Sequence, residues 1–163
     1  VMIKSNRDLL LFFKRLVKFK NSFKKNEQFL IEEYISGKEL TVSIIKNQLN
    51  YIPLEVTEIV SLNKTYDYQA KYTKGFSKHF IPARITKQNH KQCLDLSLKI
   101  HKIFKCNTLS RVDFIFCKKE NKIYFLEINS QPGMTKMSLL PEQVAFNKIK
   151  FETIVKELIN NSK

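Results

Sequence analysis

At 163 residues, the chain is long enough to form one domain with a substantial buried core. Hydrophobic residues make up 43% of it and charged residues 27%, proportions that are ordinary for a soluble globular protein. No apolar run approaches the ~20 residues that a membrane-spanning helix needs. The first eight residues are polar and show no signal-peptide pattern. We therefore expect a cytoplasmic protein without a membrane partner.

The formal net charge of +14 raises the question of a nucleic-acid partner. Only four of the 29 basic residues are arginine, although arginine is the side chain that best reads bases and phosphates. The lysines are also scattered along the chain and form no single stripe. The composition therefore argues against nucleic acid as a partner, while the positive charge can help to attract a nucleotide.

The cysteine pattern excludes the common zinc sites. Cys93, Cys106 and Cys117 are widely spaced, and the three histidines stand apart from them and from one another. We expect reduced thiols that are mostly packed in the interior.

Hydrophobic periodicity predicts helices and strands in a definite order along the chain. A capping box at Ser5 to Asp8 begins the first helix. The predicted helices cover about 9–19, from Thr86 or Gln88 to about 104, and about 151–160. The predicted strands cover 29–35, 40–45, about 51–60, 109–117 and 123–129, and residues 61–86 are expected to form a long loop. The fold class is therefore α+β, a largely antiparallel sheet with helices packed on one face, in one domain over residues 1–163.

The hairpin of 109–117 and 123–129 carries the main chemical signal. If Lys119 to Asn121 form a three-residue loop, Asp113 faces Glu127 and Arg111 faces Asn129. Because strand side chains alternate between faces, all four polar groups then lie on one face, and the apolar residues Val112, Phe114, Phe116, Tyr124, Leu126 and Ile128 lie on the other.

Two readings of this polar group remain open. Two facing carboxylates repel each other unless positive charge lies between them. Asp113, Glu127 and the amide oxygen of Asn129 offer the hard oxygen ligands that Mg²⁺ prefers. An ion-pair cluster of Arg111 with Asp113 and Glu127 explains the same pattern equally well.

Other candidate site residues carry weaker signals. Gly133, in a loop directly after the hairpin, allows close backbone approach and an N–H directed at an oxyanion, or simply forms a turn. The acids around residues 32–39 suit a nucleotide, but they also suit a solvated strand and turn. Lys71 lies in a tyrosine-rich loop, where it is either a phosphate contact or a surface lysine.

Taken together, these segments resemble D-alanine–D-alanine ligases of the ATP-grasp superfamily. The similar segments are LIEEYISGKELTV at 30–42, YDYQAKY at 66–72, SRVDFIF at 110–116, FLEINSQPGMTKMSLLP at 125–141 and FETIVKELI at 151–159. The combination of YDYQAKY and NSQPGMT is specific to the ligase, whereas RVDF and LEIN occur more widely in the superfamily.

The resemblance implies a role for each matching residue. It implies adenine binding by Glu32, Glu33 and Ile35, ribose binding by Glu39, phosphate binding by Lys71, and loop closure by Tyr72. It implies two Mg²⁺ (or Mn²⁺) ions bound by Asp113, Glu127 and Asn129. It also implies stabilisation of the tetrahedral intermediate by Arg111 and the Gly133 backbone, and binding of the second D-alanine carboxylate by Ser138 and the Leu139 backbone.

The implied reaction joins two D-alanines for peptidoglycan synthesis. ATP phosphorylates the first D-alanine to an acyl phosphate, which the amine of the second D-alanine then attacks. Two local departures from the family pattern keep the metal ligands: Gln69 stands where glutamate is usual, and Lys136-Met137 replaces Ser-His.

The resemblance further implies that the chain begins downstream of the family's Gly-Ser-Ser loop, with Met2 in place of a glycine. The amino-terminal domain and most of the central domain are then expected to be absent, nucleotide binding to be weak, and the chain to be inactive alone. Alternatives are another ATP-grasp carboxylate–amine ligase, or a non-catalytic remnant that needs a complementary amino-terminal fragment. A homodimer is a further possible assembly.

Overall fold

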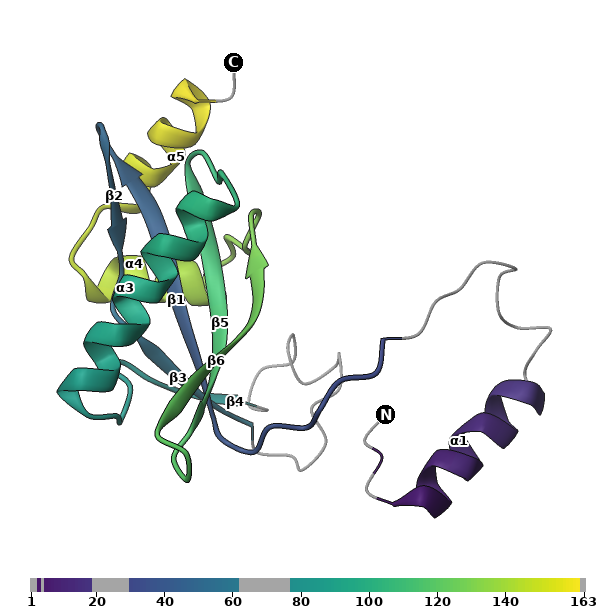
Figure 1. Ribbon diagram of the computed structural model, residues 1–163. Coiled ribbons are helices and arrows are strands. Elements are labelled where there is room, and N and C mark those ends of the chain that lie inside the picture. The colour runs from purple at the N-terminus through teal and green to yellow at the C-terminus, as the bar shows by residue number, and fades with distance from the viewer. Residues whose placement is uncertain (1–2, 4, 19–29, 62–76, 162–163) are drawn as a thin grey trace. The chain divides into compact units, whose positions relative to one another are not determined.

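The computed structural model describes residues 3, 5–18, 30–61 and 77–161 (Figure 1). The chain divides into two compact units, Val1–Ile35 and Ser36–Lys163. Each unit is treated separately below.

The first unit contains helix α1, Asn6–Lys18. The Ser5 Oγ accepts a hydrogen bond of 3.1 Å from the Asp8 backbone N–H, so the predicted cap is confirmed. Residues 30–36 have no regular structure, and the strand predicted at 29–35 is wrong over the described part. A strand needs a neighbour for its backbone hydrogen bonds, and none of the described strands pairs with this segment.

The second unit is built on a six-stranded antiparallel sheet. Its strands are β1 (Lys38–Asn47), β2 (Asn50–Pro53), β3 (Thr57–Ser61), β4 (Ser77–Phe80), β5 (Leu109–Cys117) and β6 (Lys122–Asn129). The order across the sheet is β4-β3-β1-β5-β6, and β2 also pairs with β1.

Two strand predictions need correction in this sheet. The single strand expected near 51–60 is split into β2 and β3, because the chain leaves the β1 ladder between them and both Leu54 and Val56 turn into the core. β4 lies inside the segment expected to be a long loop, where a four-residue strand gives almost no periodicity to detect.

Helices cover both faces of the sheet (Figure 1). Helix α3 (Lys87–Ile103) packs through Cys93 against Val42 and Val112. Helix α4 (Leu139–Phe146) instead donates a hydrogen bond from Gln143 to the Oγ1 of Thr57. Thr57 pairs with Thr41 of β1, and Thr41 is the residue next to Val42. Neighbouring strand residues point to opposite faces, so α4 lies on the face opposite α3. The antiparallel α+β class is confirmed, but the helices do not all pack on one face.

Helix α5 (Phe151–Asn160) has the bounds predicted from its periodicity. Its Ile154 is buried in a second core cluster with Leu140 and Val144 of α4 and with Ile45 and Leu109 of the sheet. Helix α4 was not predicted, although Ser138 is a suitable cap and a proline is tolerated in a first helical turn.

The hairpin of β5 and β6 departs from its predicted form in two compensating ways. Cys117 pairs with Lys122, so the loop has four residues (118–121) instead of three. A β-bulge then places Leu126 as an extra residue, because Asp113 pairs with Glu127 while Phe114 pairs with Phe125. The pairing is therefore as predicted at the polar end of the hairpin. Beyond the bulge, the face of Phe114 and Phe116 receives Phe125 and Ile123, and not Tyr124 and Leu126 as predicted.

A buried carboxylate joins β3 to the chain that follows β4. Glu58 is 2% exposed and accepts hydrogen bonds from Arg84 Nε at 2.9 Å, from a terminal Arg84 nitrogen at 2.7 Å and from Lys38 Nζ at 3.3 Å. These cations, Arg84 above all, lower the pKa of Glu58 to about 2. The guanidinium of Arg84 also lies over the Phe80 ring, 3.5 Å from its centroid.

The Glu58 cluster predicts a defined loss of stability in acid. A carboxylate whose pKa is lower in the folded state stabilises the protein above its unfolded pKa of about 4.5, and this contribution disappears as the pH falls towards 2. Because Arg84 is half exposed, we expect a loss on the order of 2 kcal/mol in the free energy of unfolding. Urea unfolding measured between pH 5 and pH 2 tests this. Glu58→Gln should be less stable at pH 5 and less sensitive to acid, whereas the exposed Glu152→Gln should keep the wild-type pH dependence.

Gly37 marks a point of close approach between the start of β1 and β5. A Cβ at this position would lie 2.4 Å from the Phe116 carbonyl oxygen and 2.5 Å from Ile115 Cγ2. Both distances are far below van der Waals contact, and the oxygen belongs to the backbone, so the ladder itself would have to shift.

We therefore expect Gly37→Ala to lower the free energy of unfolding by about 1–3 kcal/mol, as overpacking usually does. The neighbouring exposed Ser36→Ala is the matched control and should change it by less than about 0.5 kcal/mol. Equal stability of the two variants in urea would contradict the close approach of β1 and β5.

Candidate metal and nucleotide site

The face of the sheet opposite α3 carries the predicted site residues of β1, β5 and β6. Residues that pair across neighbouring strands share a face, so the register gives three rows of side chains. The rows are Ser43, Arg111 and Asn129; then Thr57, Thr41, Asp113 and Glu127; then His79, Ile59, Glu39, Ile115 and Tyr124. The predicted metal ligands and the predicted ribose-binding acid Glu39 are therefore on one face.

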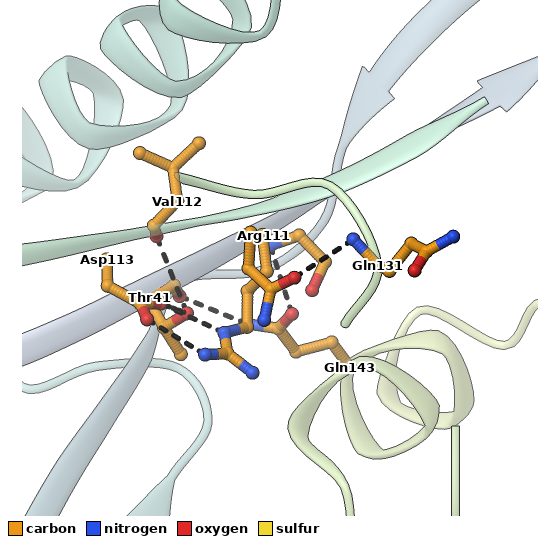
Figure 2. A network of polar contacts seen from close by, with 8 residues as sticks. Thr41, Arg111, Val112, Asp113, Gln131 and Gln143 are labelled. Atoms are coloured by element: carbon orange, nitrogen blue, oxygen red, sulfur yellow. Dashed lines mark hydrogen bonds and ion pairs between the residues drawn. The ribbon is translucent and has the colours of Figure 1, made fainter. Parts of the chain in front are cut away.

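Among the described residues, three hydrogen bonds hold Asp113 (Figure 2). Its Oδ1 accepts from Thr41 Oγ1 at 2.5 Å and from Arg111 Nε at 3.0 Å. Its Oδ2 accepts from a terminal nitrogen of Arg111 at 2.9 Å. Arg111 therefore donates to both oxygens of the carboxylate, in the bidentate geometry that arginine favours.

Glu127 lies directly across from Asp113 but in a different environment. Its side chain is exposed, and it makes no hydrogen bond or ion pair with the residues that the structure describes. Asn129, two residues further on the same face, accepts a hydrogen bond of 2.9 Å at Oδ1 from the Gln131 backbone N–H. Two carboxylates and an amide oxygen thus lie on one face of the hairpin.

This geometry bears on both readings of the polar group. The ion pair of Arg111 with Asp113 is present, with both side chains largely buried. Among the described contacts, Arg111 does not also pair with Glu127, so the negative charge of Glu127 has no positive partner among the described residues. The atoms available as metal ligands are all oxygens, which suit Mg²⁺ better than zinc.

Neither metal-ligating histidine nor cysteine takes part in this site. Within residues 3, 5–18, 30–61 and 77–161, no three or more His, Cys, Asp and Glu side chains are grouped so that they could hold a metal ion, and the predicted set has two carboxylates and one amide. All three cysteines are free, and burial raises the pKa of the Cys93 thiol to about 12. Those observations agree with the expected packed thiols.

The loop between β6 and α4 contains internal hydrogen bonds between Thr135 and Ser138. Ser138 Oγ accepts from the Thr135 backbone N–H at 3.2 Å and lies 2.9 Å from Thr135 Oγ1. A Cβ at Gly133 would lie 2.8 Å from the same Ser138 Oγ. The structure therefore brings Gly133 and Ser138 together, and Leu139 follows as the first residue of α4.

Thr41 and Gln143 belong to this site and were missed in the sequence. Both are fully buried, and both bond to the polar rows. The alternation of Thr41 and Ser43 with apolar neighbours gave a usable signal, since two polar residues in a buried strand need partners. Gln143 lies in an apolar stretch that was not predicted to be helical, so nothing marked it as inward-facing.

The predicted nucleotide-binding residues are distributed over both units. Glu32 and Glu33 are exposed and Ile35 is half-buried, in the irregular segment of the first unit. Glu39 is half-buried near the start of β1 in the second unit. Lys71 and Tyr72 lie outside the described residues.

No helix in the described part of the chain is both long and apolar enough to cross a bilayer.

Comparisons with known proteins show the family to which this fold belongs. Residues 14–160 match the family described as D-ala D-ala ligase C-terminus. A D-alanine–D-alanine ligase of Carboxydothermus hydrogenoformans is 40% identical over 134 residues, which cover 82% of this chain and 43% of the relative. One from Wolbachia pipientis wMel is 41% identical over 143 residues, covering 87% and 44%. The chain thus spans less than half the length of these relatives.

Solved structures show the same relationship. The Bacillus anthracis D-alanine–D-alanine ligase complexed with ATP superimposes with a TM-score of 0.72 at 25% identity, covering 99% of this chain and 49% of that one. The fold is that of the carboxy-terminal domain of an ATP-grasp protein. More specifically, the chain belongs to the family of D-alanine–D-alanine ligase carboxy-terminal domains.

Proposed function

We propose that this chain supplies the magnesium- and ATP-binding part of an enzyme that joins two D-alanines to D-alanyl-D-alanine for peptidoglycan synthesis. The supporting observation is the pair of carboxylates of Asp113 and Glu127, which face each other on β5 and β6 of a domain of this family. The reaction proceeds through an acyl phosphate, at the expense of ATP, in the cytoplasm. Besides D-alanine and ATP, the proposed partners are a second copy of the chain or a complementary amino-terminal fragment.

Asp113, Glu127 and Asn129 would hold two Mg²⁺ ions, which Mn²⁺ can replace. Their oxygen donors fit such ions, and Glu127 has no competing partner among the described residues. Bound there, a divalent ion supplies positive charge beside the phosphate oxygens of ATP.

Arg111 and the backbone N–H of Gly133 stabilise the negative oxygen of the tetrahedral intermediate in this proposal. Arg111 has five N–H donors in one plane, and two of them bond to Asp113, so Asp113 fixes the orientation of that plane. Gly133 has no side chain to crowd Ser138, whose Oγ lies where a Cβ would make a 2.8 Å contact. Donors that are held in place before charge develops are the most effective kind.

Ser138 and the Leu139 backbone bind the carboxylate of the second D-alanine. They lie at the amino-terminal end of α4, where unpaired backbone N–H groups and the helix dipole favour an anion. Ser138 makes no side-chain cap of its own helix, and its hydroxyl is instead bonded to the loop at Thr135.

The proposed nucleotide contacts follow the family resemblance residue by residue. We assign adenine to Glu32, Glu33 and Ile35, ribose to Glu39, phosphate to Lys71, and closure over the phosphates to Tyr72. For Glu39, the supporting observation is its position on the same face as Asp113 and Glu127.

Isothermal titration with ATP in magnesium tests the proposal on this chain alone. Glu127→Ala removes an exposed carboxylate without a described partner, so it should leave the fold intact and weaken ATP–Mg²⁺ binding by at least about 10-fold. The exposed Glu152→Ala is the control for the change in net charge and should bind as the wild type does. Unchanged affinity in Glu127→Ala would sink the proposed metal site.

A further inference from the structure

Among the described hydrogen bonds to Asp113, a proposed metal ligand, the one from the Thr41 hydroxyl is the shortest. Thr41 is fully buried in β1, and its Oγ1 lies 2.5 Å from Asp113 Oδ1 and 3.4 Å from the Val112 carbonyl oxygen. A hydroxyl has one hydrogen, and an ionised carboxylate at the shorter distance is the stronger acceptor. The hydrogen therefore goes to Asp113.

This bond makes the two oxygens of Asp113 unequal. Among the described residues, Oδ1 accepts from both Thr41 and Arg111, whereas Oδ2 accepts from Arg111 alone. The oxygen with fewer donors retains more capacity to coordinate a cation. The three hydrogen bonds from Thr41 and Arg111 leave the carboxylate little freedom to rotate.

Thr41 is itself fixed from the opposite direction by α4. The Gln143 side-chain amide donates to the Thr41 carbonyl at 3.0 Å (Figure 2). It also donates to Thr57 Oγ1 at 2.9 Å, and its oxygen accepts from the Ser43 N–H at 3.1 Å. Gln143 bonds to β1 at the point where the neighbouring strand changes: residues up to Thr41 pair with β3, and residues from Ile44 on pair with β2. Gln143 thus replaces missing ladder bonds on both sides of Val42.

We propose that Thr41 is a positioning residue for Asp113, which fixes Oδ1 so that Oδ2 is presented to the divalent cation. This rests on the proposed function, because it takes Asp113 to be a metal ligand. Gln143 holds the strand on which Thr41 lies, and so links α4, which follows the Gly133–Ser138 loop, to the same carboxylate.

Mn²⁺ binding to the intact chain in the presence of ATP, measured by the loss of the electron paramagnetic resonance signal of free Mn²⁺, tests this. Thr41→Val keeps the shape of the side chain and removes the hydroxyl, and we expect affinity for Mn²⁺ to fall about 10-fold. Thr41→Ser restores the hydroxyl and should recover affinity to within about twofold of the wild type. Loss of packing alone would not be repaired by serine, which lacks the methyl group.

The matched control is Ser97→Ala, which also removes a fully buried hydroxyl, but from α3 on the other face of the sheet. Its hydroxyl donates to the Cys93 carbonyl at 2.7 Å, so Mn²⁺ affinity should stay near the wild-type value. Wild-type affinity in Thr41→Val, an equal loss in Ser97→Ala, or failure of Thr41→Ser to recover would each overturn the assignment. Asp113→Asn separates the two proposals, because unchanged Mn²⁺ binding in that variant contradicts the metal site itself.

Discussion

Two like charges on neighbouring strands are the constraint on which the site depends. Asp113 and Glu127 occupy directly opposed positions, an arrangement that is unfavourable unless the charges are compensated. The protein compensates one of them internally, with Arg111 and the Thr41 hydroxyl. The other is exposed and has no partner in the described part of the chain. In the proposed function, a divalent cation compensates Glu127 beside the rigidly held Asp113, as ATP–magnesium chemistry needs.

The sequence was sufficient for the hairpin and its polar end, because period-two alternation places residues on faces regardless of how the strands connect. The predicted pairing of Asp113 with Glu127 is correct, but only because two departures from the predicted hairpin cancel each other. The loop has one residue more than expected, and the bulge at Leu126 takes up that extra residue. Bulges have no strong sequence signal, so the residues beyond this one, Tyr124 among them, were placed on the wrong face. The long helices were predicted well for a similar reason, since seventeen residues in α3 give a clear period and four residues in β4 do not.

What the sequence could not give are contacts between segments far apart in the chain. Gln143 bonds to residues about 90 to 100 positions away, and its amide replaces backbone ladder bonds that no local pattern reveals as missing. The same applies to Glu58 and Arg84, which read as ordinary surface charges, whereas Glu58 is in fact buried and paired with the half-exposed Arg84. Segment 30–36 shows the converse, since its residues have strand propensity but no described strand to pair with. Side-chain roles in binding remain proposals, supported by the family and by the shared face.

The most direct measurement is a crystal structure of the chain with Mn²⁺ and a non-hydrolysable ATP analogue, with the metal located by its anomalous scattering. The account predicts anomalous density in direct contact with Asp113 Oδ2 and the Glu127 carboxylate, beside the phosphates, with Thr41 still bonded to Oδ1. Metal bound elsewhere in the protein, with Arg111 and Asp113 undisturbed and Glu127 facing only solvent, would contradict it.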